Sequence, residues 1–465
     1  MQDFWSPLQK IIMSICSNFD RTWQIRKRVI DTNFLVLFIF KLVLSKNCQG
    51  YKSLLAELWE NSELNAFQKQ PVSASSICEA RQKLSEEIFI ELNKAILSHQ
   101  ERLMPSSNWC GHRIFAGDGS KINLPHELLL NGYRAPNKGQ YYPQGIMSAI
   151  YHLGHGFIHD CLLSKESERH CIIRQMDTLL KNDVLVLDRG YFSYLILYKA
   201  VEKGIHLICR LQSGSMNKSV ENFWKSGLTD TIIEYYPSAA VKSEIKKQGF
   251  YLTYRPIKLR LIKYQIEEEI YVCATTLIGA SYPGDEFPCL YHGRWGIEEL
   301  YKISKEFINV EDFHSKSERG VKQELYAHAL LINIARIFEF EANKQLPPLS
   351  SDKDFDLKEE IKESYWQGVF KGIKKMKINF KNCLLVISRF IEKLIITLEV
   401  EKSWLTKMLN SISYVRQKIK PGRHYPRRSR KPYTKWQSSS KSLLKTSISS
   451  ENEASSTGIA VLKAA

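Results

Sequence analysis

The sequence predicts an α/β protein in which a mixed sheet carries flanking helices, with further helical regions at both ends of the chain. Three observations lead to this prediction. Apolar residues recur at helical spacing through the first hundred residues. Short runs of β-branched and aromatic residues then alternate with helical stretches between residues 112 and 211. Amphipathic helices follow from residue 290 onward, and a chain of 465 residues is long enough for roughly three domains.

Composition excludes several classes of protein. Apolar residues make up 44% of the chain and charged residues 25%, as in folded globular proteins and unlike disordered or multi-span membrane chains. The longest apolar run, residues 34–44, is interrupted by Lys41 and is shorter than the ~20 residues of a membrane span, so no membrane association is expected. The N-terminus lacks the pattern of an export signal. The ten cysteines support neither a zinc module nor a disulfide framework and indicate a reducing, intracellular location.

The charge balance indicates a polyanionic partner. The 66 Lys and Arg residues exceed the 49 Asp and Glu residues, which gives a net charge of +17. Residues 416–435 contain no acid, and their cations alternate with aromatic residues, which suits contact with phosphates and bases. A solvated tail that aids solubility is the alternative. The candidate DNA-binding residues of this segment are Arg423, Arg427, Arg428, Arg430 and Lys431.

The first part of the chain, residues 1–105, is expected to be helical. Apolar residues recur at helical spacing in residues 25–45 and 51–59. Ser76 with Glu79 forms a capping-box pattern ahead of another periodic stretch. Short helices of this kind form either a helix-turn-helix DNA reader or a small bundle, and no residue pattern decides between the two.

From about residue 110 the pattern changes to strands that alternate with helices. Residues 146–152 and 157–164 are expected to form a hairpin around Gly154, His155 and Gly156. The other elements expected here are a strand at 112–120, a helix at 168–180, a strand at 184–188, a helix at 191–201 and a strand at 206–211. Three strands followed by alternating helices and strands imply one mixed sheet with helices packed on it.

Residues 213–281 interrupt this alternation with a region of β-branched and aromatic residues, as in a separate antiparallel unit. The strands expected there lie at 251–254, 259–264 and 270–276. The helices expected afterwards lie at 290–307, 321–338 and 356–409. Residues 437–465 are rich in serine and low in aromatic residues, so we expect them to be disordered.

Two aspartates are candidates for a catalytic site. Asp118 follows a predicted strand at 113–117, and Asp188 follows one at 183–187. Strand ends are rigid mounts, and Mg²⁺ prefers oxygen ligands such as carboxylates. Phosphoryl transfer on nucleic acid often uses two Mg²⁺ ions about 3.5–4 Å apart. Asp-Gly and Asp-Arg-Gly are also common turn sequences, so each aspartate taken alone favours a simple turn.

The helix predicted at 290–307 brings a third acid. Drawn at ~100° per residue, four of its side chains fall within an arc of about 60°: Tyr291, Arg294, Glu298 and Lys305. The opposite side is apolar and consists of Ile297, Leu300, Ile303 and Phe307. One face is therefore expected to pack, while the other presents an acid between two cations and an aromatic hydroxyl. The alternative is a solvent-exposed face with a Glu298–Lys302 pair.

The pattern Y-x2-R-x3-E-x6-K formed by these four residues resembles the YREK signature of DDE insertion-sequence transposases of the insertion sequence family four group. The segments 118–120 and 188–191 are similar to the first and second acidic motifs of that group. Residues 80–84 and 322–327 are similar to its N-terminal motif and its C-terminal helix. The resemblance covers residues 73–340, including the long gap before the third acid, where the family carries a strand-rich insertion.

This resemblance implies a ribonuclease-H-like core and a DNA transposase. Two Mg²⁺ ions, for which Mn²⁺ would substitute, would be held by Asp118, Asp188 and Glu298. Activated water would cut the transposon end, and the freed 3′-OH would attack the opposite strand or target DNA. The backbone of the cleaved end would be gripped by Tyr291, Arg294 and Lys305. The implied partners are terminal inverted repeats, target DNA and a second copy in a DNA-bound homodimer, in the cytoplasm of a prokaryote and associated with its nucleoid.

The predicted organisation has six parts. In order they are a helical DNA-binding region (1–105), the first part of the catalytic core (106–212), a β-rich insertion (213–281), the second part of the core (282–345), a helical region (346–415) and a basic, disordered tail (416–465). Two alternatives stay open: a catalytically silent DNA-binding derivative of a transposase, and a ribonuclease-H-like nuclease that does not join strands. The presence of all three acids argues against the first, and the YREK cations argue against the second.

Other features of the sequence are weaker candidates. His152, His155 and His159 surround the predicted hairpin, but no cysteines or further acids are arranged to support Zn²⁺, so packing is the favoured role. Trp224 is expected either to stack on an unpaired base or to belong to the core. The chain contains no G-x4-G-K-[ST] loop and no G-x-S-x-G motif, so ATP-driven action and acyl transfer are not expected.

Overall fold

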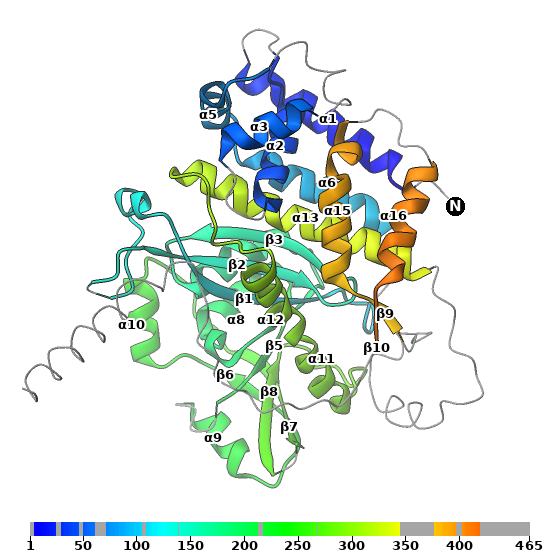
Figure 1. Ribbon diagram of the computed structural model, residues 1–465. Coiled ribbons are helices and arrows are strands. Elements are labelled where there is room, and N and C mark those ends of the chain that lie inside the picture. The colour runs from blue at the N-terminus through cyan, green and yellow to red at the C-terminus, as the bar shows by residue number, and fades with distance from the viewer. Residues whose placement is uncertain are drawn as a thin grey trace, which may run out of the picture. The chain divides into compact units, whose positions relative to one another are not determined.

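The computed structural model describes residues 4–24, 29–45, 50–60, 71–104, 108–137, 139–212, 217–266, 268–344, 376–396 and 402–418. The chain divides into two compact units, Met1–Ile419 and Lys420–Ala465. The second unit lies outside the described residues, and so do the tail cations predicted to contact DNA: Arg423, Arg427, Arg428, Arg430 and Lys431. All described elements belong to the first unit (Figure 1).

The described part of the first hundred residues folds into helices, as the sequence predicts. The helices are α1 (Ser6–Trp23), α2 (Thr32–Leu44), α3 (Tyr51–Glu60), α5 (Ala74–Lys83) and α6 (Glu87–Leu103). Asp31 caps α2 by accepting a hydrogen bond from the Phe34 amide at 2.7 Å. Ser73 caps α5, so this helix begins earlier than the capping-box pattern at Ser76 indicates. Most of α2 is buried because it packs against α1 and against helices from the second half of the chain.

Eight strands form one mixed sheet. The strands are β1 (Ile114–Asn123), β2 (Gln144–His152), β3 (Phe157–Ser164), β4 (Val184–Leu187), β5 (His206–Arg210), β6 (Asp230–Tyr235), β7 (Ile257–Ile266) and β8 (Glu269–Thr275). Their order across the sheet is β3-β2-β1-β4-β5-β8-β7-β6. Strands β1, β2 and β3 pair antiparallel, whereas β4 pairs parallel with both β1 and β5. The first five strands therefore have the order and directions of a ribonuclease-H-like sheet, and the predicted fold class is confirmed.

The predicted insertion extends this sheet and is not a separate unit. Strands β6, β7 and β8 pair antiparallel with one another, as expected, but β8 also pairs with the core strand β5, with Ile208 beside Thr275. Residues 251–254, expected as a strand, are irregular. Strand β6 and helices α9 (Lys218–Lys225) and α10 (Ala239–Lys247) were not predicted. Local patterns indicate strands but not the edge that each strand joins, which is why the sheet extension was missed.

Helices cover both faces of the sheet (Figure 1). Alternate residues of β1 belong to different cores: Phe115 packs in the cluster that includes α8 (Tyr194–Lys203), and Ala116 packs in the cluster that includes α13 (Glu318–Lys344). Helix α7 (Glu168–Gln175) contributes to the first of these clusters. Because the central strands are covered on both faces, all four residues of β4 are apolar and buried.

Helix α13 joins the helical regions to the sheet. It packs against β3 and against α2, α6 and α15 (Phe380–Ile396). Helix α16 (Lys402–Tyr414) and an antiparallel pair of short strands, β9 (Met376–Ile378) and β10 (Arg416–Lys418), complete the described C-terminal part. Within the described ranges, no helix combines the length and the apolar character needed to cross a lipid bilayer.

The two segments that resemble family motifs but carry none of the three acids, residues 80–84 and 322–327, meet at a buried helix junction. Arg81 of α5 donates hydrogen bonds to the side chains of Gln323 at 3.1 Å and Glu324 at 2.9 Å. It also donates to the carbonyl of Gly320 at 3.1 Å. The Gln323 amide in turn donates to the carbonyls of Arg81 and Leu84. These bonds fix α5 against α13, and both charged side chains are almost fully buried.

Candidate active site

Strand pairing brings the two aspartates to neighbouring positions. Strands β1 and β4 run parallel, and their register pairs Gly117 with Leu187, the residues that precede Asp118 and Asp188. Asp188 follows the end of β4, as expected. Asp118 does not end its strand, because β1 continues to Asn123. The expectation of a strand end and turn at Asp118 is therefore wrong, and this acid is mounted within a continuous strand.

The helical segment that carries the third acid is interrupted, whereas the sequence predicts one continuous helix. Helix α11 (Phe287–Gly293) ends before Arg294, and α12 (Trp295–Lys302) carries Glu298. A π-helical turn, Ile303–Phe307, follows directly. Two glycines flank the break and lower the helix propensity there, which explains why the amphipathic pattern overestimates the length of the helix. π-Helical turns are frequent at functional sites.

Arg294 lies between carboxylates from different elements. Its Nη2 donates to Glu298 Oε1 at 2.7 Å, and its Nη1 lies 4.0 Å from Asp118 Oδ2. The hydroxyl of Tyr291 donates to Asp188 Oδ1 at 2.8 Å. The Arg294 guanidinium lies over the Tyr291 ring, 5.6 Å from its centroid. The structure thus places side chains from β1, from the end of β4 and from α11–α12 around one guanidinium.

Lys305 lies further along the same helical segment, in the π-helical turn. Its Nζ donates to the carbonyl of Lys121 at 2.6 Å, three residues beyond Asp118 in β1. Burial is the largest influence on its pKa and holds it below the usual value of a lysine. The residues expected on the opposite, packing side are buried or half-buried: Ile297, Leu300, Ile303 and Phe307. The fourth residue of the YREK pattern therefore contacts the strand that carries the first acid.

The two aspartates differ in how well their charge is compensated. Burial, the largest influence, raises the pKa of Asp118 to about 6, although hydrogen bonds and Arg294 favour the charged form. Burial acts in the same direction on Asp188, but the hydrogen bond from Tyr291 and other contacts outweigh it, so the pKa of Asp188 lies below its usual value. A partly buried carboxylate with too little positive charge nearby is suited to bind a cation.

Three residues to which the sequence patterns assign no role lie at the first aspartate. The hydroxyl of Tyr191 donates to Asp118 Oδ1 at 3.2 Å, and that of Tyr301 donates to the Asp118 carbonyl at 2.6 Å. Glu168 of α7 interacts electrostatically with Asp118 and Tyr191. Its side chain covers Gly119 so closely that a Cβ there would lie 2.7 Å from Glu168 Cγ. Each tyrosine follows an acid by three residues, a spacing visible in the sequence, whereas Glu168 has no such signal.

The donor set suits a hard divalent cation. The three carboxylates of Asp118, Asp188 and Glu298 offer only oxygen, which is the ligand that Mg²⁺ and Mn²⁺ prefer. Among the residues that the structure describes, no group of three His, Cys, Asp or Glu side chains has the arrangement of a metal site. Glu298 is bonded to Arg294 instead, and this guanidinium supplies the positive charge between the acids. The oxygen donors of the three acids therefore fit a metal ion, although Glu298 is hydrogen-bonded to Arg294 and not to an ion.

The histidines of the hairpin take part in packing. The rings of His152 and His159 each lie 4.9 Å from the ring of Phe115. His152 is buried, and burial lowers its pKa to about 3, so it is neutral at neutral pH. These contacts support the packing interpretation. Trp224 is half-buried against a small cluster that includes Phe223, which favours a core role for this tryptophan.

Comparison with known proteins identifies the domain around the acids. A family model described as a transposase DDE domain matches residues 109–334. The chain is also similar to the transposase InsG of insertion sequence element IS4 from Escherichia coli strain K12, with 22% identity over 337 residues, 70% of this chain and 73% of InsG. Residues 109–334 are thus similar to a transposase DDE domain. A solved synaptic complex of the piggyBac transposase with hairpin DNA matches 88% of this chain and 84% of its own chain, at 10% identity and a TM-score of 0.39.

The predicted recognition as a DDE insertion-sequence transposase is confirmed by the first two matches. The matched region runs from just before β1 into α13. It therefore includes all three acids and the four residues of the YREK pattern. The roles of these residues in the transposase, and the boundaries of its six predicted parts, stay predictions.

Proposed function

We propose that this transposase binds the ends of its insertion sequence and catalyses Mg²⁺-dependent DNA strand cleavage and strand transfer. Its catalytic carboxylates and metal ligands in this proposal are Asp118, Asp188 and Glu298. The observation that supports it most is the meeting of three chain segments around one arginine. Arg294 reaches Asp118 and Glu298, while Tyr291 of the same segment is bonded to Asp188.

The contacts of the acids support a division of roles. When bound, Mg²⁺ or Mn²⁺ would activate the attacking oxygen and stabilise the leaving oxygen. Asp118 is suited to this site because its partly buried carboxylate, with a pKa of about 6, gains its charged form when a cation is near. Tyr191 and Tyr291 orient the two aspartates by donating one hydrogen bond to each. Glu298 becomes available as a ligand when it exchanges its bond to Arg294.

When Glu298 gives up its hydrogen bond to Arg294, the Arg294 guanidinium becomes available to bind DNA. The planar guanidinium of Arg294 can meet two phosphate oxygens at once, and Tyr291 and Lys305 lie on the same helical segment. We assign these three residues to the backbone of the cleaved end. The tail cations would neutralise further phosphates: Arg423, Arg427, Arg428, Arg430 and Lys431. Two ends would be held in a homodimer, and the protein would act at the nucleoid in the cytoplasm of a prokaryote.

A cleavage assay on the full-length protein tests this proposal. The substrate is a duplex that carries the inverted repeat flanking the coding sequence, with Mg²⁺ present. We expect Asp118→Asn, Asp188→Asn and Glu298→Gln each to reduce cleavage by roughly 10³-fold or more, with DNA binding nearly unchanged. Glu244→Gln, which removes an exposed carboxylate of α10, is the matched control and should cleave normally.

Two results would contradict the proposal. Normal cleavage by any of the three acid variants would remove that acid from the site. A protein that cuts the repeat but never joins the freed 3′-OH to a plasmid target would be a nuclease and not a transposase. Calorimetric titration with Mn²⁺ gives a readout that is independent of activity, because the acid variants should bind the ion more weakly than the wild-type protein.

A further inference from the structure

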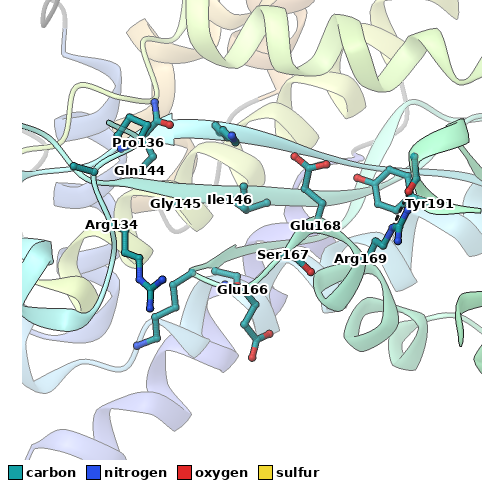
Figure 2. A pocket seen from close by; sticks show the side chains of 15 residues that line it. Arg134, Pro136, Gln144, Gly145, Ile146, Glu166, Ser167, Glu168, Arg169 and Tyr191 are labelled. Carbon is teal, nitrogen blue, oxygen red and sulfur yellow. Dashed lines mark hydrogen bonds between the residues drawn. The ribbon is translucent and has the colours of Figure 1, made fainter. Parts of the chain in front are cut away.

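A groove of about 560 Å³ lies beside the turn that follows Asp188. Figure 2 shows the side chains that line it. One wall is the connection between β1 and β2, and the other wall is the segment that leads into α7. The first residues of β2 and the end of β1 lie between these walls. The groove is lined by Lys121, residues 134–136, residues 144–146, residues 164–169, Gly190 and Tyr191. It therefore opens at the turn that follows Asp188.

The walls of the groove are held in place by their own hydrogen bonds. The amide of Gln144 donates to the carbonyl of Arg134 at 2.9 Å, which ties the connection to the start of β2. Lys165 donates from Nζ to the carbonyl of Asn131 at 2.9 Å and so links the two walls. The groove is therefore formed before a ligand arrives, and a ligand need not order the connection in order to bind.

The lining of the groove is mainly cationic. Two acidic residues stand against four basic ones, which are Lys121, Arg134, Lys165 and Arg169. One of the acids, Glu166, pairs with Arg174 at 3.3 Å, and Figure 2 shows its carboxylate pointing away from that of Glu168. Lys121 and Arg134 are exposed, and no hydrogen bond or ion pair involves their side-chain nitrogens within the described residues. The groove thus carries positive charge that the rest of the described chain does not neutralise.

Two contacts connect this groove to the catalytic residues. Arg169 donates from Nε to the carbonyl of Gly190 at 2.8 Å, in the turn after Asp188. The carbonyl of Lys121 accepts the hydrogen bond from Lys305. Through Arg169 and the backbone of Lys121, the groove is therefore in contact with the turn after Asp188 and with Lys305. A polyanion with regularly spaced charges is the ligand that such a preformed row of cations fits.

We infer that this groove binds the phosphodiester backbone of the DNA as it passes the acids, with Lys121 and Arg134 as the phosphate-binding residues. The inference rests on the proposed function and adds the course of the DNA across the protein. Contacts from lysine and arginine to phosphates carry no sequence information, so the groove positions DNA without reading its sequence. Each phosphate contact steepens the salt dependence of duplex binding by about 0.9 in the slope of log K against log salt.

The test compares two double variants of the full-length protein. Lys121→Gln/Arg134→Gln removes the two unpaired groove cations, and Lys246→Gln/Lys247→Gln removes two exposed lysines of α10, so the net charge falls equally. Fluorescence anisotropy over a series of KCl concentrations measures binding to a terminal-repeat duplex and to a random-sequence duplex of the same length. We expect the groove variant to lose roughly 10-fold in affinity for both duplexes and about 1–2 in salt slope. The control variant should bind as the wild type does.

Two outcomes overturn the inference. Unchanged affinity and slope in the groove variant would show that DNA does not run there. Unchanged DNA binding together with weaker self-association in sedimentation without DNA would assign the groove to a second copy of the chain. Cleavage by Asp188→Asn separates the possible failures. If that variant is inactive while the groove variant binds normally, only the groove inference fails, whereas an active Asp188→Asn would contradict the proposed function whatever the groove does.

Discussion

Two arginine–glutamate pairs in this protein invite comparison, one at the buried helix junction and one at the acids. At the junction, Glu324 accepts hydrogen bonds from Arg81 at 2.9 Å and from the amides of His314 and Ser315. Burial, the largest influence, would raise the pKa of Glu324, but Arg81 and His314 outweigh it and hold the pKa below its usual value. The charge of Glu324 is therefore compensated by the protein itself.

At the acids the compensation is incomplete. Arg294 bonds to Glu298 and lies 4.0 Å from Asp118, yet its Nε is buried without a hydrogen-bond partner among the described residues. The pKa of Asp118 accordingly rises to about 6, chiefly through burial, instead of falling as that of Glu324 does. The same residue types thus form a fully compensated pair at the helix junction, Arg81 and Glu324, which we call the closed pair. At the acids, Arg294, Asp118 and Glu298 form an incompletely compensated group, which we call the open set. Partly buried charges that the protein does not fully compensate are typical of a site that a ligand completes.

The largest effect on stability is expected at the closed pair. Glu324→Gln keeps the shape of the side chain but leaves the charge of Arg81 buried without its partner, so the free energy of unfolding should fall by about 3–5 kcal/mol. Urea denaturation of the full-length protein measures this change. Glu341→Gln is the matched control, because it removes a glutamate paired with an exposed lysine of the same helix and should cost less than ~1 kcal/mol. Equal costs for the two variants would show that the junction is not a structural pair.

The corresponding change at the open set should affect activity far more than stability. Arg294→Gln removes the guanidinium assigned to phosphate, and we expect cleavage to fall by roughly 10²-fold. The urea midpoint should move little, because Glu298 and Asp118 keep contact with solvent. Arg294→Lys retains the charge without the planar fork and should fall between the wild type and Arg294→Gln. A loss of stability as large as that of Glu324→Gln would make Arg294 a structural residue like Arg81.

The sequence predicts the residues of these two sites only in part, because the spacing of residues along the chain indicates local structure but not contacts between distant segments. A continuous run of apolar residues indicates the strand that ends just before Asp188, and the helical period places Tyr291, Arg294 and Glu298 together. These features depend on residues within about one or two turns of each other. For the same reason, the helical character of the first hundred residues and the order of the core elements follow from the sequence.

The features that were missed all depend on contacts between distant residues. Arg81 and Glu324 are 243 residues apart, and both lie in segments that resemble family motifs, yet nothing in either segment predicts that they form a pair. The entry of β8 beside β5 and the approach of Glu168 to Asp118 are likewise set by packing of the whole sheet. The break at Arg294 was missed because the apolar period continues through it. Tertiary contacts therefore decide which charges are compensated, and the sequence shows only which charges exist.

A smaller effect on stability is expected from the incompletely compensated charge of Asp118. Burial raises its pKa to about 6, above the value of ~3.9 in an unfolded chain, so the folded protein binds more protons between about pH 4 and 6. Stability should therefore fall as pH rises through this window. Asp118→Asn removes the penalty and should raise the free energy of unfolding at pH 7 by roughly 1–2 kcal/mol in the presence of EDTA, with a smaller gain at pH 5.

Urea denaturation at the two pH values measures this gain, and Asp285→Asn, at an exposed acid, is the control that should show none. Mn²⁺ should stabilise the wild-type protein more than Asp118→Asn, because the ion compensates the same charge. Equal stability of Asp118→Asn and wild type at pH 7 would mean that the acids are as well compensated as the helix junction.

The smallest effects are expected from the two tyrosines that donate hydrogen bonds to the aspartates. Tyr291→Phe removes the 2.8 Å hydrogen bond to Asp188, and Tyr191→Phe removes the 3.2 Å bond to Asp118. Each change should raise the pKa of its aspartate, so the pH of half-maximal Mn²⁺ binding should rise by a few tenths of a pH unit, more for the shorter bond. Tyr251→Phe, at an exposed tyrosine, should leave that pH unchanged. If both site variants titrate as the wild type does, hydrogen bonds from tyrosine do not tune the open set, and burial together with Arg294 alone distinguishes it from the closed pair.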